Sequence, residues 1–417
     1  MIRNLINNYD RIKSNDKLYF LTICFFPLSL ILGNLLINTL IFFFTISFIL
    51  NFKKNLIFIN NKIIYFFSFF LFSLIINLIF TSNFENSFPR VIKIFSIILV
   101  TIETLRIFNK YDEEFLKNIF SIWALIFLIV IFDCVFEIIF GFNTLGFSTS
   151  LPGRIASFFG EELIVGAFVH GFALIFIGYL INKNSNSFFL GFCILFIIVV
   201  SFLIGERSNF LKLFISIIIF SLIAIRANYL NKFISFLIVL TLMIGVLIFN
   251  KDYQHRYYGQ IETLYKKNGL VNFYKNSQYG AHYNAAIKIF IEYPLFGVGI
   301  KNFRFESGKD KYRNDEYGKT NARQATHPHQ VHLEFLSETG IFGYFAFLLF
   351  ISYSLFVSFK SYLKNKNIFL LSSIIFILTS LLPLLPSGSF LSTFNSGIFW
   401  INYIIMIGLC KILKTKV

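Results

Sequence analysis

The stretch LLINTLIFFFTISFIL, Leu35–Leu50, contains no charged residue over 16 positions. A second apolar run, residues 18–33, precedes it almost without a break. Because about 20 mostly apolar residues are enough to cross a bilayer as a helix, the two runs predict a helical hairpin in a membrane. No small-residue cleavage site follows the first run, which argues against a secretory signal peptide.

The rest of the chain has the same character. Hydrophobic residues make up 56% of the sequence and charged residues only 14%, whereas a soluble domain is nearer a quarter charged. We therefore predict an all-α, polytopic integral membrane bundle of about twelve transmembrane helices. The predicted spans are residues 18–33, 34–50, 63–80, 91–108, 119–140, 163–182, 187–205, 208–226, 232–250, 340–358, 367–383 and 394–411. The four cysteines lie isolated in apolar runs and have no metal-binding spacing.

Basic residues alternate between the two sides of these spans. One set of gaps holds clusters such as Lys53, Lys54 and Lys62, while the short loops on the opposite side hold only Arg90, Arg154 and Arg207. Under the positive-inside rule, this asymmetry predicts that both termini face the cytoplasm. The net charge of +16 is then mainly a matter of topology, and we do not expect nucleic-acid binding.

One long polar segment interrupts the pattern and falls on the outer face. We divide the chain into nine transmembrane helices over 1–250, a large periplasmic loop over 251–339 and three further transmembrane helices over 340–417. Inside the loop, a helical stripe of apolar residues ends at Pro294. A helix lying on the membrane surface and a helix packed on the mouth of the bundle both fit this stripe.

Three of the six histidines lie in ATHPHQVHLEFLSETG, Ala325–Gly340. Pro328 suits the first turn of a helix, so we predict His327 as N-cap and His329 in the first turn. The helix dipole would then disfavour imidazolium and keep His329 neutral, able to accept a proton. On that helix His329 and His332 would share one face, with Glu334 and Glu338 pointing away.

Simpler roles for these histidines remain open. Interfacial histidines also cap helices or bind lipid headgroups. Three imidazoles are enough to hold a catalytic zinc ion. We do not favour a metal site, because His327 and His332 diverge on a helix and no cysteine is near.

Two further motifs place charge at the membrane border. The segment IGERSNFL, Ile204–Leu211, contains Arg207. Placing an arginine at membrane depth costs about 3 kcal/mol, which makes it a functional candidate. Its planar guanidinium group suits phosphate oxygens. Its alternatives are an ion pair between Glu206 and Arg207 or an Arg–carbonyl contact. In PGRIASFFGEELIVGAFVHG, Pro152–Gly171, Arg154, Glu161 and Glu162 precede a span. Those carboxylates would position a hydroxyl or cap the helix.

These motifs together resemble a known family. HPHQVHLEFLSETGIFG, preceded by AHYNAAIKIFIEYPLFGVGIKNFR, is similar to the C-terminal signature of the O-antigen ligase and polymerase superfamily. GERSNFL resembles that family's arginine segment at the membrane border, and GRIASFFGEELIVGAFV resembles an earlier outer-loop segment. The four segments follow the family's order and cover about residues 150–345.

The resemblance implies a membrane glycosyltransferase of the GT-C type that uses no metal or other cofactor. Such enzymes move a glycan from undecaprenyl diphosphate to an acceptor hydroxyl on the periplasmic side of the bacterial inner membrane. The acceptor is lipid A–core in a ligase of lipopolysaccharide biosynthesis and another carrier-linked glycan in a polymerase. His329 matches the family's essential histidine, a general base, and Arg207 matches its diphosphate-binding arginine. Glu162, Glu338, His327 and His332 are expected to support them.

Two positions depart from the family pattern. Gln330 follows the histidine where an asparagine is usual, which keeps the amide. Tyr279 stands where a second diphosphate-binding arginine is often found, and we expect His282, Arg256 or Lys288 to replace it, with Arg154 as a further donor contact. Polymerases and protein-glycosylating relatives remain alternatives. A transporter is less favoured, since the halves of the chain show no repeat.

Overall fold

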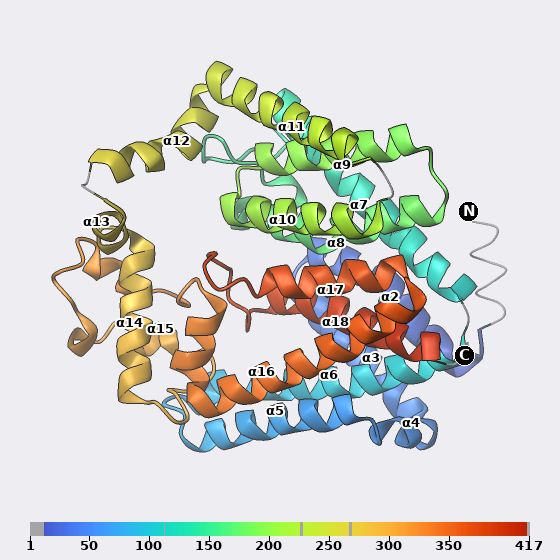
Figure 1. The fold of residues 1–417 in the computed structure, drawn as a ribbon. Helices are drawn as coiled ribbons and strands as arrows, with labels where there is room; N and C mark the ends of the chain where they lie inside the picture. Colours follow the sequence, from blue (N-terminus) through green and yellow to red (C-terminus); the bar gives the residue numbers. More distant parts are fainter. Residues whose placement is uncertain (1–11, 112, 226–227, 267–268, 415–417) are drawn as a thin grey trace.

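The computed structural model describes residues 12–111, 113–225, 228–266 and 269–414. Within these ranges the regular structure is helical and contains no strand (Figure 1). The helices are α2 (Ser14–Leu32), α3 (Asn34–Leu50), α4 (Phe52–Ile59), α5 (Lys62–Ile79), α6 (Phe84–Lys110), α7 (Glu113–Phe140), η1 (Ser157–Glu162), α8 (Val165–Asn182), α9 (Ser187–Leu203), α10 (Arg207–Ala224), α11 (Tyr229–Phe249), α12 (Lys251–Lys266), α13 (Leu270–Lys275), α14 (Gln278–Glu292), α15 (Phe303–Glu306), η2 (Asp310–Tyr312), η3 (Thr320–Arg323), α16 (Val331–Asn365), α17 (Ile368–Ser380) and α18 (Thr393–Lys414).

Fewer helices than predicted meet the length and composition expected of a membrane span. Among the described residues eight qualify, or nine if α3 and α4, bent by 93°, count as one span. Helices α6, α9 and α17 also occupy predicted spans but do not qualify. The last two have only 17 and 13 residues, and α6 carries several charged side chains. The structure confirms an all-helical, multi-pass membrane chain and supports eight or nine spans rather than twelve.

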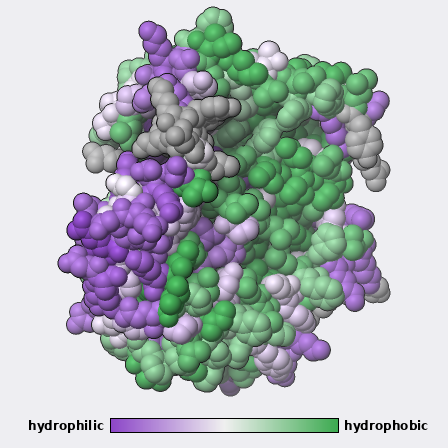
Figure 2. Space-filling model, turned by 60° about the vertical axis from the view of Figure 1, so that its left-hand side comes forward, coloured by the Kyte–Doolittle hydropathy of each residue, from purple (hydrophilic) through white to green (hydrophobic). Residues whose placement is uncertain are grey.

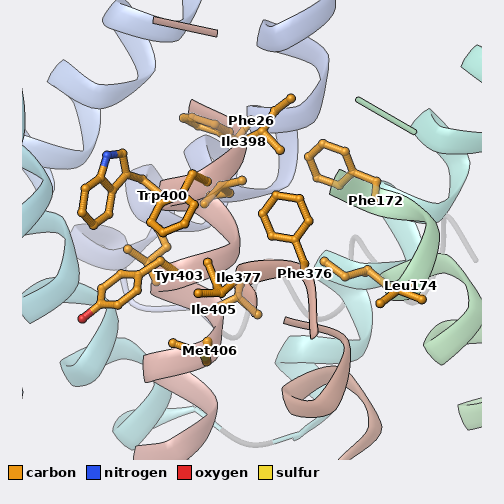
Figure 3. Packing of buried hydrophobic residues seen from close by; sticks show 14 of the residues in the cluster. Phe26, Phe172, Leu174, Phe376, Ile377, Ile398, Trp400, Tyr403, Ile405 and Met406 are labelled. Carbon is orange, nitrogen blue, oxygen red and sulfur yellow. The ribbon is translucent and has the colours of Figure 1, made fainter. Parts of the chain in front are cut away.

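The C-terminal helix α18 lies in the middle of the bundle, packed on α6, α17 and α16. Figure 3 shows its Trp400 and Tyr403 among aromatic and aliphatic side chains of α2, α8 and α17. Trp400 stacks on Phe67 of α5 with ring centroids 5.1 Å apart. Between helices in a membrane, such close van der Waals packing is a main source of stability because lipid is as apolar as the core.

The surface separates into apolar and polar regions. Many large hydrophobic side chains of the bundle are exposed, Phe249, Phe188 and Leu35 by 80–90%. We call the described residues of 251–330 the cap. Figure 2 shows hydrophilic residues gathered over the cap and hydrophobic residues over the bundle. An exposed apolar surface of this extent fits contact with lipid.

The cap lies at one end of the bundle. Figure 1 shows α2 beginning and α18 ending at the opposite end, which we call the terminus end. The amphipathic helix α14 packs against α16 and η3 and buries Ala285, Ala286 and Ile289 in a small core of its own. Of the two arrangements that the stripe allowed, the structure therefore shows a helix packed on the mouth of the bundle.

Candidate functional site

The histidine motif differs from the sequence-based prediction in where its helix begins. Helix α16 starts at Val331, and its N-cap is Gln330, whose side chain accepts a hydrogen bond from Leu333 N at 2.7 Å. The same side chain donates to Pro383 O at 2.6 Å. His329 precedes the helix with a left-handed φ of 59°. The predictions of His327 as N-cap and of His329 in the first turn, on the face of His332, are therefore wrong.

The physical reason lies in the residues around Pro328. A proline disfavours helical conformation in the residue before it, which here is His327. Gln330 is extended, with φ −153°, and offers a side-chain oxygen that satisfies a helical N–H. The helix consequently begins after the amide side chain rather than at the proline.

His332 has a structural position. Its Nε2 lies 2.8 Å from Leu381 O and donates to that carbonyl, so Nδ1 accepts from the Tyr344 hydroxyl, also at 2.8 Å. Both ring nitrogens are thus used, and the ring fixes the start of α16 against the end of α17. Its supporting role is to hold the helix that follows His329.

The other histidines gather around His329. Its ring centroid lies 4.0 Å from that of His327 and 5.1 Å from that of His282, which stacks on it at 21°. The Tyr279 ring is 5.8 Å away, edge-on. His282 donates from Nε2 to Ala322 O at 2.9 Å. The structure therefore brings His282 to the histidines, not to the arginines with which we had grouped it as a diphosphate ligand.

These rings are neutral at pH 7. Burial, followed by the charges of His327 and His282, lowers the pKa of His329 to about 3. Burial and then the Lys301 charge lower the pKa of His327 to about 4. Among the described residues, none hydrogen-bonds to the ring nitrogens of His329, so a nitrogen is free to accept a proton. His329 is neutral because burial removes the water that would stabilise its charged form, and not because it lies in the first turn of a helix.

Three arginines from separate segments form a second group, which we call the arginine cluster. Arg207 donates to Arg256 O at 2.9 Å, and Arg256 donates from Nε to Gly205 O at 2.8 Å. Arg154 donates to Leu163 O at 2.7 Å and lies 3.8 Å from Glu206. Of the two alternatives considered for Arg207, the Arg–carbonyl contact is present, whereas Glu206 pairs with Arg154.

A close backbone contact brings these segments together. A Cβ atom on Gly205, whose φ is 76°, would lie 2.0 Å from Gly153 O, so only glycine fits there. Ile155 N donates to Ile204 O at 3.2 Å beside this contact. The two motifs that sequence analysis treated separately are thereby one structural unit.

Positive charge exceeds negative charge in this cluster. Glu206 is the only carboxylate that forms an ion pair with the three arginines among the described residues. Burial, followed by repulsion from Arg154 and Arg207, lowers the pKa of Arg256 to about 10. A bound anion with two or more negative charges would relieve this repulsion, and diphosphate is such an anion.

Comparison with known families assigns this region. Residues 192–348 match the family model described as O-Antigen ligase. This part of the chain is similar to O-antigen ligases. A comparison with curated proteins gives no match. The matched region contains Arg207, Arg256, His282, His327, His329 and His332. The similarity to O-antigen ligases therefore covers the histidine group and two of the three arginines of the cluster.

A small cavity lies between α8, α10 and α17 and is lined by His170, Asn209, Lys212 and Ser387, among others. Its volume is about 60 Å³, enough for a few water molecules. At one wall, Asn209 donates to Glu206, the partner of Arg154, at 2.6 Å. At another wall, Ser387 N donates to His329 O at 2.9 Å. The cavity is therefore linked to the arginine cluster and to His329 through neighbouring residues, although neither lines it.

Lys212 lines this cavity and was missed by sequence analysis. The side chain is 4% exposed and forms no ion pair with any described residue. A lone charge inside a predicted span was the signal that would have found it, because such charges are costly and face functional cavities. Lys212 adds a positive charge to the wall of this cavity, next to the neutral histidine group.

The predicted acidic partners have other positions. Glu338 is fully buried and accepts from Lys301 N at 2.7 Å and Phe303 N at 3.3 Å. It fixes the turn before α15 and does not contact His329. Glu162 is exposed and makes no hydrogen bond or ion pair with the residues that the structure describes. The side chain of Glu161 lies outside the described residues. Lys288, offered as a substitute cation, donates to Arg313 O at 2.9 Å.

A larger hollow adjoins the arginine cluster. It measures about 740 Å³ and lies between α7 and α11, with Gly153 and Arg154 at its lining. Most of the remaining lining residues are apolar, among them Ile138, Leu242 and Phe249. This hollow offers an apolar chain a path along the bundle to the arginines.

Proposed function

We propose that this chain transfers a glycan from undecaprenyl diphosphate to an acceptor hydroxyl, with lipid A–core as the acceptor and His329 as general base. One observation carries the proposal: His329 has free ring nitrogens and is bonded through its backbone to Ser387 at one wall of a cavity, while Glu206, the partner of Arg154, is bonded to Asn209 at another wall. The similarity to O-antigen ligases supports the substrate class. The cap lies opposite the end of the bundle where α2 begins and α18 ends, which supports a periplasmic site with both termini cytoplasmic.

The donor would bind through its two chemically distinct parts. The diphosphate would contact Arg154, Arg207 and Arg256, where guanidinium forks suit phosphate oxygens. The polyprenyl chain would lie in the apolar hollow between α7 and α11. The first sugar would then be directed toward the cavity beside Lys212 and His329.

Transfer requires one proton acceptor and one stabilised leaving group. The acceptor oxygen attacks the anomeric carbon while its proton passes to His329, and the bond from that carbon to the phosphate oxygen breaks. Negative charge then develops on undecaprenyl diphosphate. The arginine cluster and Lys212 are placed to stabilise this charge in surroundings from which water is largely excluded. The proton subsequently leaves His329 for solvent.

Glycan display in living cells tests the proposal. A strain lacking its own ligase would receive wild type, His329→Ala or His255→Ala at equal membrane levels. His255 is exposed on α12 and serves as the matched control. Wild type and the control should restore polymer on lipid A–core, while His329→Ala should lower transfer by about 10²–10⁴-fold and leave glycan on its carrier. Equal display by His329→Ala would refute the proposal.

A further inference from the structure

A second group of cations lies outside the arginine cluster. Arg90 and Lys93, near the cap end of α6, both donate to the Thr393 hydroxyl, at 3.2 and 3.0 Å. Arg304 in α15 has a buried Nε without a hydrogen-bond partner. The Arg304 charge acts on Arg90, so the two lie near each other. We call Arg90, Lys93 and Arg304 the acceptor-side cluster. No printed ion pair or hydrogen bond between described residues joins it to the arginine cluster.

The charges of this cluster form no ion pair among the described residues, although the Glu338 charge acts on Arg90 from a greater distance. Two like charges that share one hydroxyl repel each other, and this repulsion is stronger in partly buried surroundings than in water. Sites of this kind are stabilised when a ligand supplies the opposite charge.

Lys301 extends the cluster toward the histidines. It is 4% exposed and donates from Nζ to Ser389 Oγ at 2.6 Å. Its φ is 65°, a conformation that glycine adopts at lower cost. Backbone strain of this kind persists where surrounding structure enforces it, often at binding sites. Two buried carboxylates, Glu334 and Glu338, lie near the Lys301 charge, so Lys301 itself is compensated.

One segment connects the acceptor-side cluster to His329. Ser387 N is bonded to His329 O, Ser389 is bonded to Lys301, and Thr393 receives the hydrogen bonds from Arg90 and Lys93. Six residues of chain span at most about 22 Å, which limits the distance from Ser387 to Thr393. An anion at the cluster would therefore be within a few sugar units of the general base.

We infer that the acceptor-side cluster binds a phosphate group of the acceptor, so that the enzyme joins a phosphate-bearing donor to a phosphate-bearing acceptor. This inference rests on the proposed function. Since the proposed function assigns the donor diphosphate to the arginine cluster, the acceptor-side cluster is left for a second anion. A sugar phosphate on the acceptor and a second carrier diphosphate share this chemistry. A neutral peptide acceptor does not.

Binding of inorganic pyrophosphate tests the inference. The full chain, in nanodiscs of zwitterionic phosphatidylcholine, would be titrated by calorimetry. Wild type should bind two pyrophosphate ions per chain. Lys93→Met and Arg304→Gln should each weaken only one site by about tenfold or more. Arg207→Gln should weaken only the other, and Arg313→Gln, which removes an exposed charge of the cap, should keep both.

Each outcome has a distinct meaning. A single site that only Arg207→Gln weakens would overturn the inference and leave the proposed function intact. A single site that only Arg304→Gln weakens would instead contradict the donor site. Two sites still present in both Lys93→Met and Arg304→Gln would also overturn the inference. Measuring both variants guards against one that folds poorly. If orthophosphate displaces pyrophosphate from the second site equally well, a sugar phosphate is indicated; if not, a carrier diphosphate is indicated.

Discussion

The two ends of the molecule treat buried charge in opposite ways. At the terminus end, Arg106 donates to Asp16 at 2.6 Å and to Glu103 at 2.5 Å, and Lys110 also contacts Asp16. At the cap end, Lys212 is as buried as Arg106, with 4% exposure, but has no carboxylate partner among the described residues. Arg207 and Arg256 donate mainly to backbone carbonyls.

The contrast separates structural charge from functional charge. Moving a charge out of water costs several kcal/mol, which a well-placed ion pair offsets. The network of Asp16, Glu103 and Arg106 meets that condition and holds α2, α3 and α6 together. Lys212, Arg207 and Arg256 have no such ion pair among the described residues, and we propose that an anionic ligand takes its place.

The largest effect on stability is expected at the terminus end. Asp16→Asn removes one charge of the buried network and leaves Arg106 and Lys110 partly unpaired. The free energy of unfolding should fall by about 3–5 kcal/mol. Thermal unfolding in detergent would measure this, with Asp315→Asn, an exposed partner of Arg313, as control. An unchanged unfolding midpoint would mean that the ion pairs at the terminus end contribute little to stability.

Arg207→Gln should affect transfer and leave stability nearly unchanged. Loss of a cation that stabilises the departing diphosphate should lower kcat by about 10²–10³-fold. Arg207→Lys keeps the positive charge but lacks the planar guanidinium group, so its kcat should lie between those of wild type and Arg207→Gln. Transfer assays with the purified enzyme would check this order. A large drop in unfolding midpoint with normal transfer would place Arg207 among the structural charges.

The pH dependence should reflect a neutral His329. Its pKa is lowered to about 3, so the acid limb of kcat/KM should lie below pH 5, and the rate should be flat from pH 5 to 8. The same shift affects stability, because the unfolded chain binds a proton near pH 6.5 while folded His329 and His327 do not. Their stabilising contribution is complete above that pH and is lost as the pH falls toward 4. A limb of kcat/KM near pH 6.5 would show instead that His329 has an ordinary pKa.

Sequence patterns identified much of the site but not its assembly. Apolar runs predict helices because period and length are local properties, and Arg154, Arg207 and Arg256 were each named as donor contacts. Their convergence depends on the contact between Gly153 and Gly205, which no local pattern reveals. The helix start was misplaced because the proline signal was weighed above the capping capacity of Gln330.

Two other residues differ in how far the sequence could have identified them. Lys212 is a lone charge in an apolar run, which marks it as a candidate, whereas Arg304 lies in a polar loop that does not distinguish it. In neither case does the sequence show whether the charge has a partner. That property depends on the side chains which distant segments bring near. The sequence likewise did not predict that Tyr279 lies beside His329, because the family motif gives only its position along the chain.

Lys212 provides the most direct test of the central claim that unpaired cap-end cations await an anionic ligand. Thermal unfolding of wild type and Lys212→Met would be compared without and with inorganic pyrophosphate, with exposed Lys360→Met as control. Because a lysine in a membrane span costs about 3 kcal/mol, Lys212→Met should unfold at a higher temperature than wild type without the ligand. Pyrophosphate should then raise the midpoint of wild type more than that of the variant. A variant that is less stable without pyrophosphate and gains as much from it as wild type would contradict the account.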